Sequence, residues 1–447
     1  MVRMGNKSLI TRDVGFISCE MGCFFRYFLQ LVEKVCGGAD LKKHRTGDLK
    51  FIQQLNESVV LEVIREKGPI SRSKIAKVLE VSPTTVTSAV NLLMAKELVV
   101  EDGIGISSGG RKPVLLRFNP TAHSIIGVSV TNTKITIAVL DLHGNIRKRE
   151  VHPTNYAKGK VMVELLVTKV SQFVQLYEDL PHCQGISVVL PGIIDAQHGT
   201  VSYNSKLDLF DVPLAKIIEE QIHLPVFIDN DANALVLSEY YFGSFTHYKN
   251  LIYITIDEGI GSGIMINGQI FRGSNGSSGE IGHTSVVPDG MKCECGSRGC
   301  LENYVSWPVI YAKIVAAMMA NAIQSTMYTM IGGDIRKLTP EVFLKALQEE
   351  DPLALRIMQE MVRYLSIALK NYIHLFDPEA IILSGSVVQG NQLLVEQLQQ
   401  AVKKKVIPNL RSKINIQLTP LGSENRMVGA AAVLFNNKFR FTFAASD

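Results

Sequence analysis

The sequence lacks long apolar runs, has few cysteines outside one short stretch, and carries little net charge. No stretch of about 18 uncharged apolar residues occurs in the 447 residues, which argues against a membrane-spanning helix. Only seven cysteines are present, and three lie within eight residues, so a reducing compartment is favoured over a disulfide scaffold. We therefore expect a cytoplasmic globular protein of two or three domains that makes no membrane contact.

The small positive charge is concentrated at the N-terminus. Of 46 basic and 42 acidic residues, eight and four lie in residues 1–46, which leaves 38 of each in the remainder. A balanced body can bind nucleic acid only through a local surface. Acidic residues interrupt the apolar part of residues 1–46, unlike a signal peptide. We interpret this segment as a poorly ordered extension, or as the result of a start codon assigned too far upstream, with an amphipathic helix as the alternative.

The most distinctive stretch is residues 279–302, GEIGHTSVVPDGMKCECGSRGCLE. It contains Cys293, Cys295 and Cys300, and His283 precedes the first cysteine by ten residues. One histidine and three cysteines are the ligand set of a closed, tetrahedral structural zinc site. We predict that these four residues hold Zn²⁺. A disulfide or chance clustering is the alternative, although Cys293 and Cys295 are too close in sequence to bridge comfortably.

Carboxylates lie next to this cysteine-rich loop. Glu280 and Glu302 flank the predicted ligands, and a folded loop would bring both glutamates and the His283 ring together. Carboxylate oxygens accept hydrogen bonds from sugar hydroxyls. Asp231 follows a predicted strand and precedes a predicted helix, a position where open α/β folds bind ligands. The alternatives are that the glutamates are solvated loop charges and that Asp231 is a helix cap.

Residues 47–119 carry the pattern of a winged helix-turn-helix domain. Apolar residues recur at helical spacing up to Ile64, and Ser71 and Ser82 can cap two further helices. Two apolar runs around a glycine-rich tip then predict a wing. A small helical packing domain without DNA is the alternative. The predicted DNA contacts are Arg72, Ser82, Thr84, Thr85, Thr87, Ser88, Asn91, Arg111 and Lys112.

The rest of the chain predicts an α/β body with two lobes. Apolar runs separated by helical patterns indicate strands at residues 125–130, 135–140, 186–190, 226–228, 251–256 and 380–383. Hairpin signals make the first strands antiparallel. Two groups of strands indicate duplicated halves around a cleft, in residues 120–250 and 251–435, followed by a tail at 436–447. The glycine-rich residues 258–263 fit either a phosphate-binding loop or a tight hairpin.

These residues resemble the ROK family (repressors, open reading frames, kinases). The segment IDEGIGSGIMINGQIFRGSNGSSGEIGH, residues 256–283, is similar to the family signature, and the following CxCxxxxC is similar to its zinc loop. The resemblance covers residues 49–435 and implies an actin-like ATPase body of two lobes behind the winged helix. It implies that Asp231 matches the catalytic base of the kinases. It also implies zinc ligands at His283, Cys293, Cys295 and Cys300, and sugar contacts at Asn230, Asp231, Glu280, His283 and Glu302.

Two features favour the repressors of that family over its kinases. The kinases generally lack the winged helix, and residues 107–119, SSGGRKPVLLRFN, are similar to the wing of xylose repressors from Gram-positive bacteria. The kinase turn Asp-x-Gly-Gly-Thr-Lys is matched here by Ser129 to Lys134, without the aspartate and both glycines. Glu258 stands where kinases offer threonine, and a carboxylate there would repel phosphate. The retained Asp231 argues in the other direction.

We therefore expect a sugar-responsive transcriptional repressor of a carbohydrate-utilisation operon, for xylose or a related sugar, and not an enzyme. It would bind operator DNA as a homodimer or tetramer, since one short recognition helix reads few base pairs. One alternative is an ATP-dependent sugar kinase with a DNA-binding domain. Another is a repressor released by a sugar-transport protein partner.

Overall fold

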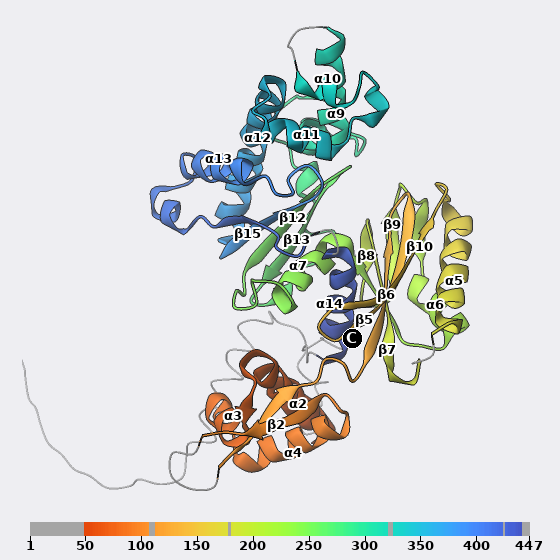
Figure 1. Cartoon of the computed structure of the whole chain (residues 1–447), viewed down its shortest axis with the longest axis vertical. Helices are drawn as coiled ribbons and strands as arrows, with labels where there is room; N and C mark the ends of the chain where they lie inside the picture. Colours follow the sequence, from red (N-terminus) through yellow and green to blue (C-terminus); the bar gives the residue numbers. More distant parts are fainter. Residues whose placement is uncertain (1–48, 107–111, 178–179, 321–324, 423–424, 440–447) are drawn as a thin grey trace, which may run out of the picture. The chain divides into compact units, whose positions relative to one another are not determined.

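The winged helix forms where the local sequence signals predict it. The structure is a computed structural model that describes residues 49–106, 112–177, 180–320, 325–422 and 425–439 (Figure 1). The expectations for residues 1–46 and for Arg111 lie outside these residues. The domain consists of α2 (Leu49–Lys67), β1 (Ile70–Ser71), α3 (Arg72–Leu79), α4 (Pro83–Ala95), β2 (Val99–Ile104) and β3 (Val114–Phe118).

Both predicted helix caps are present in this domain. The Ser71 hydroxyl accepts a hydrogen bond from the backbone N–H of Lys74 at 3.3 Å, and Ser82 accepts one from Thr85 at 3.1 Å. Such caps satisfy backbone donors that a helix leaves unpaired at its start. Antiparallel pairing of β3 with β1 and β2 forms the wing. The sequence prediction of a helix-turn-helix with a wing is confirmed.

Two five-stranded sheets with the same plan form the body. The first has the order β11-β7-β4-β5-β6 and the second β14-β13-β12-β15-β16. In each, three consecutive strands are antiparallel, a fourth strand pairs in parallel with the first of them, and a fifth pairs in parallel with the fourth. The duplicated halves and the antiparallel first strands were therefore predicted correctly. The strands are β4 (Ser124–Val130), β5 (Lys134–Asp141), β6 (Ile146–Pro153), β7 (Cys183–Leu190), β11 (Val226–Asn230), β12 (Leu251–Ile256), β13 (Ile260–Ile266), β14 (Gln269–Ile270), β15 (Ala380–Ser384) and β16 (Ile416–Leu418).

Helices cover these sheets and give each lobe its own apolar core. Helices α5 (Gly159–Gln175) and α6 (Leu214–Ile222) pack beside the first sheet, which also adjoins a small sheet of β8 (Ile193–Asp195), β9 (Thr200–Asn204) and β10 (Leu209–Val212). The second lobe is filled by α8 (Glu302–Val305), α9 (Trp307–Met319), α10 (Thr326–Met330), α11 (Pro340–Gln348), α12 (Pro352–Phe376) and α13 (Gln392–Lys403). Among the helices of the described residues, none is both long and apolar enough to cross a bilayer.

Two helices pack against the sheet of the other lobe. Helix α7 (Asp231–Tyr241) follows the first sheet in the chain but packs on β12 and β13 of the second. Helix α14 (Asn425–Phe439) follows the second sheet but packs on β4 and β7 of the first, and the two helices also contact each other (Figure 1). The predicted domain limits remain predictions. Residues 425–439, which the sequence assigns mostly to the second lobe, pack against the sheet of the first lobe. The α7–α14 pair therefore lies between the lobes.

Candidate functional site

A cleft of about 930 Å³ lies between the two lobes. Its lining includes all five residues that the sequence predicts for sugar contact, which are Asn230, Asp231, Glu280, His283 and Glu302. These residues come from the start of α7, from the loop after β14 and from the start of α8. The structure therefore brings together groups that lie up to 72 positions apart in the sequence. Their roles as ligands remain predictions.

The four predicted metal ligands also converge. Their ligand atoms all lie within 4.8 Å of one another, with Cys293 Sγ 3.6 Å from His283 Nδ1 and Cys295 Sγ 3.7 Å from Cys300 Sγ. A tetrahedral zinc ion with Zn–S bonds of 2.3 Å would separate its sulfurs by about 3.8 Å. A disulfide would need about 2.05 Å. The chemistry and spacing of this donor set therefore fit a zinc ion.

The loop backbone explains how four ligands fit into so short a segment. Val286 N–H donates to the Gly299 carbonyl at 2.8 Å, so the chain folds back on itself. Gly299 has a φ of +73°, and a Cβ atom there would lie 1.8 Å from the Val287 carbonyl oxygen. Only glycine fits so close to another backbone segment. The His283 ring faces Cys293 with Nδ1 and also lines the cleft, as does Cys295, so the metal site and the cleft share these two side chains.

Asn230 and Asp231 form the start of α7 at the cleft. The Asn230 side-chain oxygen accepts hydrogen bonds from the backbone N–H groups of Ala232 and Asn233, and its amide nitrogen donates to the Gly192 carbonyl at 2.8 Å. Asn230 is thus an N-cap that keeps one N–H free for a ligand. Burial raises the pKa of Asp231, and nearby Arg426 offsets part of that rise.

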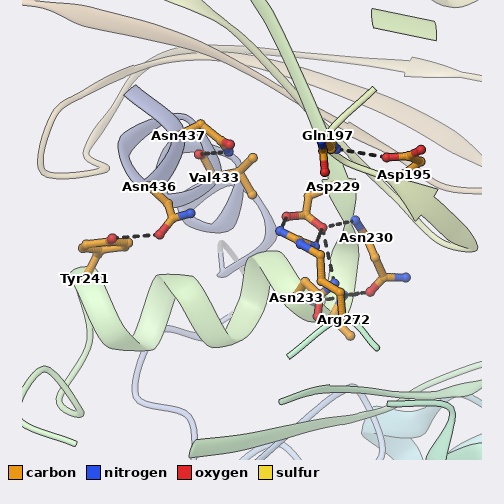
Figure 2. Close-up of polar contacts among 11 residues, drawn as sticks. Asp195, Gln197, Asp229, Asn230, Asn233, Tyr241, Arg272, Val433, Asn436 and Asn437 are labelled. Carbon is orange, nitrogen blue, oxygen red and sulfur yellow. Dashed lines mark hydrogen bonds and ion pairs between the residues drawn. The ribbon is translucent and has the colours of Figure 1, made fainter. Parts of the chain in front are cut away.

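A buried ion pair between the lobes supports this turn. Arg272, after β14, donates two hydrogen bonds to Asp229 at the end of β11, at 2.7 and 2.6 Å. Asp229 also accepts from the Asn230 backbone N–H at 2.8 Å and from the Asn233 amide at 3.3 Å. Figure 2 shows Arg272 directed at Asp229 beside Asn230 and Asn233. The pair fixes the start of α7 relative to the second lobe.

The two glutamates have different environments in the cleft. Burial raises the pKa of Glu280, His283 opposes part of that rise, and the neighbouring carboxyl groups of Asp231 and Glu302 add to it. Glu302 accepts a hydrogen bond from the Ile260 backbone N–H at 2.9 Å. Sugar hydroxyls are suitable partners for these carboxyl groups because each O–H can donate a hydrogen bond to a carboxylate oxygen.

The glycine-rich residues 258–263 form the tight β12–β13 hairpin, the second of the two alternatives. Asp257 N–H donates to the Gly259 carbonyl at 3.0 Å, which closes the turn. Gly263 lies within β13, and a Cβ atom there would be 2.3 Å from the Ala232 carbonyl oxygen. The glycine therefore allows β13 to pack closely against α7. Glu258 lines the cleft next to this turn.

Arg426 lines the cleft near Asp231 and Asp257. Its guanidinium donates to Asp257 at 3.0 Å, and its side chain lines both the main cleft and a smaller pocket of about 170 Å³. Burial alone would lower the pKa of Arg426, but Asp231 and Asp257 raise it overall. The cation is therefore already neutralised by protein carboxylates.

The predicted DNA surface is mostly exposed. On α4 and its cap, Ser82, Thr84, Thr87, Ser88 and Asn91 are exposed, Thr85 is partly buried, and Lys112 in the wing is exposed. Some of these groups have local partners: Ser82 caps α4, and the Thr87 hydroxyl donates to the Pro83 carbonyl at 2.8 Å. Arg72 is half-buried, and its guanidinium lies 3.4 Å from the Met94 sulfur. The face therefore offers short polar side chains to a partner.

Sequence reasoning missed four side chains of the site. Arg272 and Arg426 form ion pairs across the fold, and Lys206 and Trp307 line the cleft. Trp307 is the only tryptophan in the chain. No periodicity or motif pointed to any of them. The one available signal was the position of Arg272 eight residues before Glu280, within the signature segment.

The winged helix and the two-lobed body with its polar cleft define a DNA-binding protein built on a sugar-kinase-like fold. Residues 125–437 match the model of the ROK family, and residues 54–100 match that of the MarR family. The chain belongs to the ROK family.

Similar proteins include repressors and kinases. The chain is 31% identical to the "Xylose repressor" of Bacillus spizizenii over 391 residues, which cover 87% of this chain and 97% of that protein. A crystal structure of a ROK family transcriptional regulator, a homologue of the E. coli MLC protein, has a TM-score of 0.76 and 28% identity, covering 86% of this chain and 96% of that one. A ROK family glucokinase from Streptomyces griseus, in complex with glucose and AMPPNP, has a TM-score of 0.61 and 28% identity, covering 69% of this chain and 98% of that one. The predicted resemblance to repressors rather than kinases is confirmed, since the repressor matches include the winged helix.

Proposed function

We propose that this protein is a transcriptional repressor whose affinity for operator DNA is controlled by a sugar in the cleft. The observation that carries the proposal is the presence, in one chain, of an exposed polar recognition helix and a cleft lined by five hydrogen-bonding groups. The similarity to the xylose repressor of Bacillus spizizenii over 87% of the chain supports the same function. Xylose or a related sugar is the proposed effector.

The zinc ion would shape the sugar site without taking part in chemistry. His283 supplies one ligand atom to the metal cluster and also lines the cleft, so a bound ion would fix the orientation of its ring. In metal sites, a histidine commonly binds the metal through one ring nitrogen and a neighbouring group through the other, and this fixes the orientation of the ring. We therefore expect loss of the metal to weaken sugar binding as well as local stability.

The nucleotide half of the cleft would be inactive. Ser129 is buried within β4, and Thr131 and Asn132 carry side chains where kinases of the family have glycines that admit phosphate. Glu258 adds a carboxylate at the hairpin turn, and the Arg426 cation is neutralised by Asp257. A triphosphate would meet side chains and negative charge here.

The proposed DNA complex contains two copies of the chain. The hydroxyls and amide on α4 suit base edges in a major groove, and Lys112 suits a phosphate. Because a single short helix reads few base pairs, a homodimer or tetramer on a palindromic operator is expected, in the cytoplasm.

The first test is operator release. The purified chain is bound to a labelled fragment of its own promoter region and titrated with xylose, glucose and N-acetylglucosamine, each with and without ATP. Release by one sugar without ATP is the expected result and identifies the effector. Binding that no sugar reverses, but that a sugar-transport protein reverses, would favour the partner-released repressor. Failure to bind DNA would refute the proposal.

A matched pair of variants tests the cleft itself. Trp307 lies in the cleft and is the only tryptophan, so its fluorescence reports sugar binding directly. Glu280→Gln removes one charged acceptor and should weaken sugar binding by about 1.5–3 kcal/mol, or roughly ten- to a hundredfold. Glu396→Gln, on the exposed face of α13, is the control and should leave the affinity unchanged. Equal sugar affinities in the two variants would show that Glu280 does not contact the sugar.

An active sugar kinase is the second candidate, favoured by Asp231. Its carboxyl lies in the cleft, and its raised pKa is typical of a general base. The glucokinase from Streptomyces griseus shows that the fold can hold a sugar and a nucleotide together. Sugar-dependent release of ADP, abolished in Asp231→Asn, would establish this candidate. No ADP release with any of the three sugars would exclude it for that panel.

A further inference from the structure

Helices α7 and α14 both extend from the cleft to the DNA-binding domain. Helix α7 starts with Asp231 in the cleft and ends at Tyr241, and α14 carries Arg426 in the cleft near its start and ends at Phe439. The winged helix from Leu55 onward and both lobes belong to one compact unit. An apolar core that includes residues of α2, α4, β3, α7 and α14 is continuous within it.

The two helices are tied together along their length. A Cβ atom on Gly429 of α14 would lie 3.0 Å from the Ala234 carbonyl oxygen of α7, so the helices cross at close range. At the other end, the Tyr241 hydroxyl donates to the Asn436 side-chain oxygen at 2.9 Å (Figure 2). Displacement of one helix would therefore carry the other.

Arg65 of α2 is held between the ends of this helix pair. Its guanidinium carbon lies 4.8 Å from the centre of the Tyr241 ring, 5.6 Å from that of Phe242 and 4.5 Å from that of Phe435. Arg65 also donates a hydrogen bond to the Tyr241 carbonyl at 2.5 Å. This carbonyl lies at the C-terminus of α7, where the helix dipole favours a cation.

Burial makes this contact sensitive to geometry. Burial lowers the pKa of Arg65, although nearby Tyr241 and Glu62 oppose the shift. A guanidinium that is largely removed from water depends on its fixed partners. If the ends of α7 and α14 moved relative to α2, Arg65 could not keep its distances to the three rings and the carbonyl. The contact therefore favours one arrangement of α2 on the helix pair.

We propose that Arg65 couples the cleft to the DNA-binding domain by holding α2 against the ends of α7 and α14. This inference rests on the proposed function, because it describes how the sugar would control operator binding. A sugar that draws the lobes together would shift the α7–α14 pair, which lies between them, and Arg65 would carry that shift to α2 and the recognition helix. Coupling of this kind requires the sugar to bind one arrangement more tightly than the other.

The test measures the coupling itself. The sugar used is the one of xylose, glucose and N-acetylglucosamine that releases the unmodified protein from the operator. Operator affinity is measured without this sugar and with a saturating amount of it. The ratio of the two dissociation constants is the coupling factor. By linkage, operator DNA must change the sugar affinity by the same factor, read from Trp307 fluorescence. Allosteric factors are typically about 5- to 150-fold.

Arg65→Met keeps an unbranched, mainly apolar side chain, although a shorter one, and removes the charge and the hydrogen-bond donors. We expect the coupling factor to fall more than about twofold, while the sugar affinity without DNA stays that of the unmodified protein. Arg356→Met, on the exposed face of α12, is the control and should keep the full factor. A factor within twofold of the unmodified protein in Arg65→Met would overturn the inference. A factor of one in the unmodified protein with all three sugars would instead refute the proposed function.

A second variant covers the case in which Arg65→Met does not fold. Tyr241→Phe keeps the ring beneath Arg65 and removes the hydroxyl that joins α7 to Asn436 of α14. It should also lower the coupling factor more than about twofold without changing the sugar affinity in the absence of DNA. An unchanged coupling factor in a folded Tyr241→Phe protein would overturn the role of the helix pair.

Discussion

Replacing Arg272 by methionine should destabilise the protein strongly, because it leaves a buried carboxylate without its cation. The Asp229 side chain is fully buried, and Arg272 is 29% exposed. Removing one partner of a buried ion pair costs about 3–5 kcal/mol. Asp229 would keep the hydrogen bonds from the Asn230 backbone and the Asn233 amide, so we expect the lower end of this range, about 3 kcal/mol.

The chain provides a control with the same bonding and different burial. Arg336 also makes two hydrogen bonds to one carboxylate, to Asp334 at 2.9 and 3.1 Å, but Arg336 is 87% exposed. Arg336→Met should therefore leave stability unchanged within error, since exposed pairs are screened by solvent. Urea unfolding, followed by circular dichroism, gives the free energy of unfolding for each variant.

A double variant separates the loss of charge balance from the loss of packing. Combining Asp229→Asn with Arg272→Met removes the uncompensated charge, so the double variant should be more stable than Arg272→Met alone. The reasoning would be refuted by an Arg272→Met protein as stable as Arg336→Met, or by a double variant no more stable than the single one.

Three further predictions concern the metal, the pH and the salt. Cys295→Ser should lower the zinc content measured by atomic absorption and weaken sugar binding. Cys183→Ser, outside the cluster, is the control and should change neither. Unchanged zinc content in Cys295→Ser would contradict the predicted ligand set. Burial raises the pKa of Glu239 from 4.5 to about 7, so the unmodified protein should lose stability as pH rises from about 4.5 to 7. Glu239→Gln should be more stable by about 3 kcal/mol above pH 7 and equal near pH 4.5, and a constant difference across that window would exclude this titration. Lys112→Ala should reduce the slope of the logarithm of operator affinity against the logarithm of salt concentration by about one. Lys160→Ala on α5 is the control and should leave the slope unchanged. Equal slopes in the two variants would show that Lys112 does not contact a DNA phosphate.

The features predicted correctly from the sequence depend on neighbours in the chain. The predicted strands appeared as apolar runs because their residues are buried, and the hairpins followed from nearby turn residues. Ser71 and Ser82 were recognised as caps because a cap bonds to a backbone N–H three residues later. The metal ligands could be predicted because three of the four lie within eight residues.

The features that were missed join residues that are far apart in the chain. Arg272 and Asp229 are 43 positions apart, Arg426 and Asp257 are 169 apart, and Arg65 and Tyr241 are 176 apart. An arginine carries no local signal that distinguishes a buried partner from solvent. Similarly, the hydrogen bond from the Asn230 amide depends on the Gly192 carbonyl, which only the fold brings within 2.8 Å.

The sequence by itself determined the order of the modules, several strands of both sheets, the helices of the winged helix-turn-helix and the spacing of the residues that converge on the metal cluster. These features follow from short-range periodicity, capping and spacing, which act before the chain is folded. The full set of predicted cleft residues came from the resemblance to the ROK family. Only the tertiary structure decided that α7 and α14 each pack on the sheet of the other lobe and that Arg65 lies at their ends. The physical reason is that burial of a charge depends on every element packed around it, and no local pattern in the sequence records those neighbours.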